Sequence, residues 1–288
     1  MSPLPAKRAK LRGRAAKADR HDLYEISVQD PPTEVEFVSK TFKRLRKRAA
    51  LSLREDFCGT AVFSLAWVRS HKQRTAVGVD LDRDTLLWGL ERRIRPAGER
   101  DGKDYESRIT LRNANVLEPA GPLVDVAVGY NFSYWCFSTR TQLLAYLKAA
   151  RAGLSEDGML FLDAYGGTEV PMSDLNEREV RDERGIVNDG EPFTYCWEQL
   201  GYNPLTGHMD CAIHFEFEDG SRIDEAFTYS WRIWTLPELA ELLLDAGFAK
   251  VRFWAEREDD DGEGTGTYQE IQDLDNEGVW WVYISAEN

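Results

Sequence analysis

Four short stretches of the sequence carry residues that could bind a nucleotide-like ligand. The first is REDFCGTA (residues 54–61), in which Gly59 stands among small residues directly after an apolar run. Asp80 ends the second stretch (GVD), Asn115 lies in the third (NANVLEP), and Asn131 begins the fourth (NFSYW). Small residues let backbone N–H groups approach a ligand, a carboxylate accepts hydrogen bonds from ribose hydroxyls, and a side-chain amide can read an adenine edge.

Each of these residues also has a purely structural interpretation. Asp80 or Asp82 could cap the helix that follows, and Asn115 could cap a turn. Any strand-to-helix turn favours small residues, and one glycine is fewer than a dinucleotide fingerprint contains. The four stretches together are more specific than any one of them, because each is expected directly after a strand.

The elements that must position these residues alternate between strand and helix. This alternation predicts an α/β fold with a doubly wound, mostly parallel sheet covered by helices on both faces. In such a sheet, ligands bind outside the carboxyl ends of the strands, where the strand order reverses. The predicted strands are 51–57, 75–80, 108–112, 124–130 and 158–165, and the predicted helices are 60–70, 83–95 and 139–153.

The rhythm of the sequence divides the chain into five segments. Three aromatic, alternating runs broken by turn residues predict an inserted three-stranded antiparallel sheet. A helix at 235–247 and strands at 250–255 and 279–285 then complete the core, with an acidic, glycine-rich surface loop at 257–270. The expected segments are a disordered basic tail (1–20), a helical lid (21–48) with a helix at 33–48, the α/β core (49–187), the insert (188–233) and the completion of the core (234–288).

Composition and charge restrict the classes of function. The chain of 288 residues has 42% hydrophobic residues and no apolar run near the ~18 residues that span a bilayer, so we expect a cytoplasmic protein that does not contact membranes. The four cysteines lie far apart without a C-x-x-C pair, and no metal site is expected.

Residues 1–48 carry a net charge of +7 and the remainder −21. The acidic body makes a nucleic-acid substrate unlikely, although the basic tail could bind RNA or an acidic partner.

The four stretches resemble the class I S-adenosylmethionine-dependent methyltransferases, whose Rossmann-like sheet has seven strands. The family's first loop has an acid followed by three alternating glycines; here Gly59 keeps the middle position, while Phe57 and Ala61 replace the outer two. The resemblance implies S-adenosylmethionine as cofactor. It assigns the amino group to Glu55 (or Asp56 in the other register), the methionine portion to Cys58, Gly59 and Thr60, the ribose to Asp80 and Leu81, the adenine to Asn115 and Val116, and the floor near the sulfonium to Asn131 and Phe132.

The inserted sheet resembles that of small-molecule methyltransferases acting on glycine-like amines or amino sugars, in which it covers the substrate pocket or pairs two subunits. We therefore expect direct methyl transfer to a small amine or hydroxyl, and a homodimer could form through the insert. A macromolecular (protein or RNA) methyltransferase and a non-catalytic cofactor-binding protein are the alternatives. No residue stands out as a general base; the candidates are His208, His214 and Tyr24. Candidates for substrate binding are Tyr24, Tyr134, Trp135, Tyr165, Trp197 and Arg232.

Overall fold

The computed structural model describes residues 11–119, 121–182, 190–259, 264–276 and 278–288. The chain divides into two compact units. The larger unit contains residues 30–170 and 232–288, and the smaller contains the chain up to Gln29 together with residues 171–231. No helix in these described ranges is long and apolar enough to cross a membrane.

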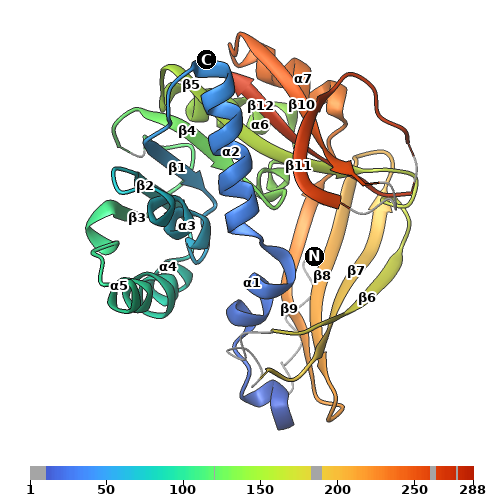
Figure 1. The fold of residues 1–288 in the computed structure, drawn as a ribbon. Coiled ribbons are helices and arrows are strands. Elements are labelled where there is room, and N and C mark those ends of the chain that lie inside the picture. The colour runs from blue at the N-terminus through green and yellow to red at the C-terminus, as the bar shows by residue number, and fades with distance from the viewer. Residues whose placement is uncertain (1–10, 120, 183–189, 260–263, 277) are drawn as a thin grey trace. The chain divides into compact units, whose positions relative to one another are not determined.

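The larger unit is built on an eight-stranded sheet with the order β11-β10-β12-β5-β4-β1-β2-β3 (Figure 1). Strand β1 pairs in parallel with β2 on one side and with β4 on the other, so the strand order reverses at β1. The predicted doubly wound sheet is confirmed. Its strands are β1 (Ser52–Asp56), β2 (Thr75–Asp80), β3 (Ile109–Asn113), β4 (Val124–Gly129), β5 (Leu154–Gly166), β10 (Lys250–Glu258), β11 (Gly264–Ile271) and β12 (Trp280–Glu287).

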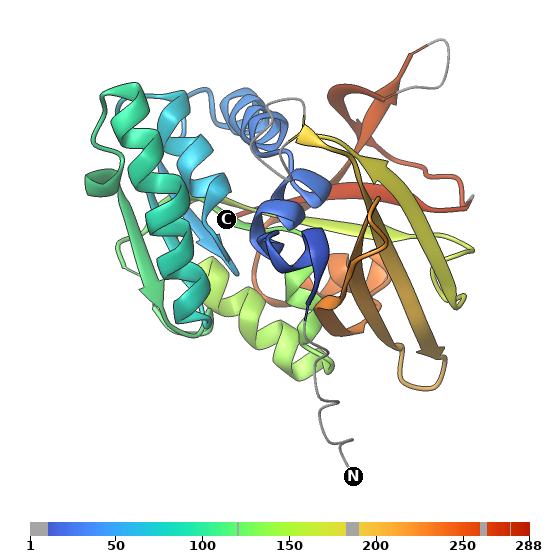
Figure 2. The same ribbon diagram turned by 90° about the horizontal axis from the view of Figure 1, so that it is seen from below.

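Helices cover both faces of this sheet. Helices α2 and α3 contact each other on one face, and α6 and α7 contact each other on the opposite face, as the view in Figure 2 shows. Apolar residues of α2 and α3, among them Phe42 and Trp67, are buried against β1, β4 and β5. The helices are α2 (Pro31–Arg46), α3 (Val62–Ser70), α4 (Arg83–Gly89), the π-helical turn η2 (Leu90–Ile94), α5 (Arg95–Asp101), the 3₁₀ turns η3 (Glu106–Arg108) and η4 (Ser133–Cys136), α6 (Arg140–Ala152) and α7 (Leu236–Asp245).

The helix starts follow local sequence signals. Asp30 caps α2 and is followed by two prolines in the first turn, where a missing N–H costs no hydrogen bond. Thr139 and Thr235 each form a reciprocal capping box with the side chain three residues later. These caps fix where α2, α6 and α7 begin relative to the strands before them.

The sheet has one more strand than the expected seven. The segment predicted as a surface loop, 257–270, contains most of β11, which pairs antiparallel with β10. The register of this pair shifts between Glu256 and Glu258. The prediction of a loop was wrong because glycines and polar residues at an exposed sheet edge lack the apolar alternation of a half-buried strand.

The smaller unit contains a four-stranded antiparallel sheet, β6-β7-β8-β9, seen at the right of Figure 1. Three strands were expected; the missed β6 has six exposed residues out of seven and so shows no buried alternation. Apolar side chains of α1, such as Leu23, pack on one face of this sheet together with Phe193 and Phe215. Its elements are η1 (Gly13–Ala16), α1 (Arg20–Val28), β6 (Asp174–Val180), β7 (Phe193–Asn203), β8 (His208–Phe217) and β9 (Arg222–Arg232).

Part of the predicted disordered tail has defined structure. Residues 1–10 lie outside the described residues, but η1 is a 3₁₀ turn in which Ala15 is fully buried. The backbone N–H of Arg14 donates to the Asp219 carboxylate at 2.9 Å. Disorder was therefore the wrong expectation for residues 13–16, because the tertiary contacts that order them are remote in sequence. The division between the two units also falls after Gln29, inside the segment predicted as a lid.

Candidate functional site

The loop after β1 has an unusual backbone path. Phe57, Gly59 and Ala61 all have positive φ, at 58°, 51° and 59°. These are the three positions at which the methyltransferase pattern has glycine. Two of them are occupied here by residues for which the left-handed region costs about 1–2 kcal/mol. The loop therefore keeps the glycine-type path although only one glycine remains.

Hydrogen bonds hold this strained loop in place. The Cys58 N–H donates to the carbonyl of Val79 at 3.0 Å, and the Ala61 N–H donates to the carbonyl of Cys58 at 2.7 Å. The Gly59 N–H donates to the Asp80 carboxylate at 2.8 Å. The end of β2 thus fixes the loop after β1, so these two strand ends form one rigid structure.

The space in front of Gly59 is open. A Cβ built on Gly59 would have a single neighbour within 4 Å, the Cγ2 of Thr85 at 4.0 Å. By contrast, a Cβ on Gly89 of α4 would come within 2.2 Å of the Thr60 carbonyl oxygen. Gly89 therefore lets the helix pack closely behind the loop, while Gly59 leaves backbone accessible in front of it.

Asp80 joins two turns rather than capping a helix. One carboxylate oxygen accepts the Gly59 N–H, and the other accepts the Asp82 N–H at 2.8 Å. Asp82 is the residue that caps α4, accepting from the backbone N–H groups of Asp84 and Thr85. This resolves the alternative left open by the sequence and leaves the remaining lone pairs of the Asp80 carboxylate for a ligand.

Three charged residues at the end of β1 are buried. The Glu55 carboxylate accepts hydrogen bonds from the backbone N–H and the hydroxyl of Ser64 through one oxygen, Oε2. Burial raises the pKa of Glu55 to about 8, with the charges of Asp80 and Asp56 adding to the effect. Asp56 instead pairs with the guanidinium of Arg54 at 2.7 Å. Of the two acids, Glu55 therefore points to the α3 side of the loop, and Asp56 belongs to an internal ion pair.

The residues assigned to adenine and ribose lie close to these strand ends. The Asn115 side chain accepts the Leu117 N–H at 3.0 Å and so caps a turn, as its structural interpretation proposed. Val116 is buried, and its carbonyl accepts from Arg54 at 2.6 Å. Leu81 is 71% exposed directly after Asp80, which makes its side chain available to cover a ligand.

The loop after β4 is also strained and anchored. Asn131 and Phe132 have φ values of 56° and 55°. Their backbone N–H groups donate to the two carboxylate oxygens of Asp163 at 2.8 and 3.0 Å. Asp163 is buried on β5, and burial raises its pKa to about 7 against the lowering effect of these two hydrogen bonds. Asp163 thus sets the path of the loop that begins with Asn131.

Most of the predicted substrate-binding aromatics of the larger unit are core residues. Tyr134 and Trp135 are fully buried, and the Tyr134 hydroxyl donates to the Asp163 carbonyl at 2.7 Å. Tyr165 is 8% exposed and stacks on Trp135, with its ring 4.9 Å from the Trp135 ring and 4.6 Å from the partly buried Phe132. The rings of Trp135 and Tyr165 therefore pack against Phe132.

Arg232 is held by its own surroundings. Its guanidinium pairs with Glu238 at 3.0 Å and lies 3.7 Å from the centre of the Trp234 ring. Arg232, a candidate for substrate binding, therefore has a structural ion pair.

The catalytic candidates in the smaller unit have structural partners. The Nδ1 of His214 accepts the Glu225 N–H at 3.0 Å, so its Nε2 carries the proton and donates to Glu198 at 3.0 Å. The Nε2 of His208 contacts the carboxylate of Asp210 at 3.1 Å. His214 therefore has no free nitrogen lone pair to act as a general base, and the Nε2 of His208 is engaged by Asp210 and by the Ser230 hydroxyl at 3.0 Å.

Two predicted aromatic residues of the smaller unit also pack within it. Tyr24 packs on Phe227 with ring centres 4.8 Å apart. Trp197 packs on Tyr229 and Trp231, with ring centres 6.0 and 5.9 Å away. Both residues belong to aromatic clusters of this unit.

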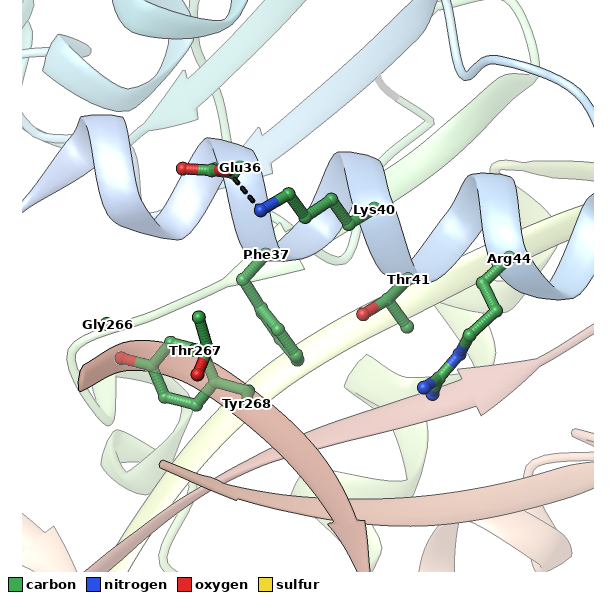
Figure 3. A pocket seen from close by; sticks show the side chains of 8 residues that line it. All are labelled: Glu36, Phe37, Lys40, Thr41, Arg44, Gly266, Thr267 and Tyr268. Carbon is green, nitrogen blue, oxygen red and sulfur yellow. Dashed lines mark ion pairs between the residues drawn. The ribbon is translucent and has the colours of Figure 1, made fainter. Parts of the chain in front are cut away.

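A groove of about 180 Å³ runs between α2 and β11 (Figure 3). Its lining residues are Glu36, Phe37, Lys40, Thr41, Arg44, Gly266, Thr267 and Tyr268. The groove follows the middle of α2 rather than the carboxyl ends of the parallel strands, where ligands of such sheets bind. We therefore place the candidate site at the loops after β1, β2 and β4.

Comparison with solved structures shows that the chain has the class I methyltransferase fold. It resembles an S-adenosylmethionine-dependent methyltransferase from Clostridium acetobutylicum (TM-score 0.65, 13% identity, 93% of this chain and 96% of that chain). It also resembles CalS10, an amino pentose methyltransferase from Micromonospora echinaspora (0.65, 14%, 93% and 96%), and KedS8, a sugar N-methyltransferase from Streptoalloteichus (0.59, 15%, 99% and 99%). No protein-family model and no curated protein matches the chain.

Two buried acids near the candidate site were missed from the sequence. Asp163 lies in the predicted strand 158–165, and Glu34 lies at the start of the helix predicted at 33–48. Burial raises the pKa of Glu34 well above its ordinary value, and the charges of Asp163 and Glu55 add to the effect. An acid inside an otherwise apolar strand was the available signal for Asp163; Glu34 had none, because a first-turn glutamate is common on exposed helices.

Proposed function

We propose that the protein is an S-adenosylmethionine-dependent methyltransferase that transfers a methyl group directly to a small-molecule amine. The observation that carries the proposal is the left-handed, open Gly59 beside the Asp80 carboxylate at the point where the strand order reverses. This arrangement suits a ligand with a ribose diol and a chain that passes close to backbone. The similarity to structures described as S-adenosylmethionine methyltransferases supports the same ligand.

The described residues suit this cofactor in charge as well as in shape. S-adenosylmethionine supplies a methyl group already activated by a sulfonium. Glu55 and Asp80 offer carboxylates at the ends of adjacent strands, and the single glycine suits a methionine chain better than a pyrophosphate, which needs several backbone N–H groups. Glu55 would hold the amino group, Gly59 would lie along the methionine chain, and Asp80 would accept the ribose hydroxyls.

An amine is the acceptor that these residues serve best. An amine nitrogen has its own lone pair and needs mainly positioning and exclusion of water, whereas a hydroxyl usually needs a base. The histidines considered as bases have structural partners, and the net charge of −21 on residues 49–288 attracts cationic molecules. The amino pentose and sugar N-methyltransferases of similar fold are consistent with this class of acceptor. Pairing of two subunits through the inserted sheet stays a prediction.

Calorimetry with S-adenosylmethionine, S-adenosylhomocysteine and NAD tests the cofactor assignment. We expect micromolar binding of the first two and none of NAD. Asp80→Asn should weaken both by about tenfold, because the hydrogen bonds of the ribose to a charged acceptor are lost. Asp84→Asn, which removes an exposed acid in the first turn of α4, is the matched control. Binding of NAD without binding of S-adenosylmethionine would refute the proposal.

A further inference from the structure

Four side chains that end in an acid or a phenol face one region under the first turn of α2. Glu55 lies in β1, Tyr130 directly follows β4 and Asp163 lies in β5, and these three strands are neighbours in the sheet. Because side chains alternate between the faces of a strand, all three lie on the face that α2 and α3 cover. Glu34 approaches from α2 itself. We call Glu34, Glu55, Tyr130 and Asp163 the acid–tyrosine cluster.

Glu34 is the least expected member of this cluster. It is only 6% exposed, and the neighbouring charges that act on it most strongly are those of Asp163, Glu55 and Asp30, all of them carboxyls. A helix N-terminus favours a nearby carboxylate, but an exposed glutamate would gain as much from it without the cost of burial. The position of Glu34 therefore has no explanation in the packing of α2.

Tyr130 contributes a hydroxyl that lacks a hydrogen bond. The residue is 6% exposed, and no partner for this hydroxyl exists among the described residues. Its ring is fixed between Phe63 and Tyr283, whose centres lie 5.6 and 5.2 Å away. Burial raises the pKa of Tyr130, and the charges of Glu34 and Asp163 raise it further, which places the hydroxyl within their electrostatic reach. A buried hydroxyl needs a hydrogen-bond partner, and a ligand bound at this cluster would supply one.

The cluster is suited to a positively charged nitrogen. Buried carboxyl groups without a cation are costly, and an ammonium group offsets that cost while donating to carboxylate and phenol oxygens. Aromatic faces such as those of Tyr130 and Tyr283 also attract a substituted ammonium. Tyr130 and Asp163 belong to the β4–β5 side of the switch point, whereas Gly59 and Asp80 belong to the β1–β2 side. The cluster therefore reaches the β4 side of the candidate site, where Asn131 and Phe132 are expected to lie near the sulfonium and hence near the methyl acceptor.

From this arrangement, we infer that Glu34, Tyr130 and Asp163 bind the amino group of the methyl acceptor as it arrives in its cationic form. The ammonium then gives its proton to one of the two carboxylates, and the freed nitrogen lone pair accepts the methyl group. The inference rests on the proposed function and narrows it to acceptors that carry a basic amine. Glu55 belongs to the acid–tyrosine cluster and is also the residue proposed to hold the amino group of the cofactor's methionine portion.

Sinefungin tests the inference, because a carbon bearing an ammonium group replaces the sulfur of S-adenosylhomocysteine, so that the nitrogen takes the place of the transferred methyl group. We expect Glu34→Gln to weaken sinefungin about tenfold while S-adenosylhomocysteine binds unchanged in calorimetry. The ligand-free Glu34→Gln protein should also melt at a higher temperature than wild type, because glutamine can be buried without the proton uptake or the uncompensated charge that a buried carboxyl requires. Glu36→Gln removes an exposed carboxylate from the same helix and should change neither affinity.

Each outcome separates the inference from the proposed function. If wild type binds neither compound, the proposed function is lost. If Glu34→Gln weakens both compounds equally, the cluster holds the methionine end and the inference is wrong; if it weakens neither, the cluster holds no cation and the inference is also wrong. Tyr130→Phe, which removes only the unpartnered hydroxyl, provides a second variant should Glu34→Gln fold poorly, and we expect a smaller loss in the same direction.

Discussion

Replacing Gly59 with alanine separates the strain of the loop from its contact with a ligand. The backbone there has φ of +51°, so alanine adds a left-handed penalty of about 1 kcal/mol. The new methyl group would meet protein only at 4.0 Å, so packing adds nothing to this penalty. Alanine also lowers the entropy of the unfolded chain, which stabilises the variant by at most about 1 kcal/mol and so partly offsets the strain. We expect a fall in melting temperature of at most a few degrees.

The effect on the cofactor should be much larger than the effect on stability. A methyl group that projects into the open space before Gly59 would displace a ligand packed on that backbone, and we expect S-adenosylmethionine to bind about tenfold or more weakly. Gly102→Ala is the matched control, because Gly102 has φ of +61° and no atom within 4 Å of the added Cβ. Calorimetry and thermal melting of both variants give the comparison. If Gly59→Ala binds S-adenosylmethionine within twofold of wild type, the ligand does not approach this loop.

Three further predictions concern stability. Arg54→Met should cost about 3–5 kcal/mol in denaturant unfolding, because it leaves the Asp56 carboxylate buried without its cation. Ala61→Gly should change the free energy of unfolding by less than about 1 kcal/mol. The relief of about 1–2 kcal/mol of left-handed strain offsets the loss of a buried methyl group and the added entropy of the unfolded chain. Ala150→Gly, inside α6, relieves no such strain and should cost about 2 kcal/mol. Burial raises the pKa of Glu55 from 4.5 to about 8 in the folded protein, so between these pH values the folded state binds one proton more than the unfolded state. The free energy of unfolding therefore falls as the pH rises through this range. Glu55→Gln should make the melting temperature depend less on pH between pH 4.5 and 8.

Each of these has a clear contrary result. An Arg54→Met variant as stable as wild type would mean that the pair is not buried in solution. A loss of about 2 kcal/mol for Ala61→Gly would mean that the loop is not left-handed there. An unchanged pH slope in Glu55→Gln would mean that Glu55 titrates normally.

Much of the larger unit could be predicted from sequence because its signals are local. The strands before Gly59 and Asp80 are short apolar runs, and the helices between them carry caps and periodic apolar faces. The positions of the strand ends followed from the alternation of the two kinds of element, so the approximate place of the candidate site followed too.

What could not be predicted depends on contacts between distant residues. Glu34 is buried only because the ends of three strands lie beneath it, and nothing in TEVEFVSK distinguishes it from the exposed Glu36. The partners of His214 likewise come from two neighbouring strands, β7 and β9. The backbone at Phe57 and Ala61 is a similar case, since sequence alone suggests that non-glycine residues would change the path of the loop.

The edge strand β11 has a consequence for the behaviour of the protein at high concentration. An exposed strand with free backbone groups invites another chain to extend the sheet, which is a route to aggregation. Here Gly264 and Gly266 weaken the outer strand, and the register shift between Glu256 and Glu258 bends the strand beside it. The carboxylates of that segment also repel a second copy. The sheet therefore ends in a segment that is a poor template, and solubility would be the property at risk if these glycines were replaced by β-branched residues.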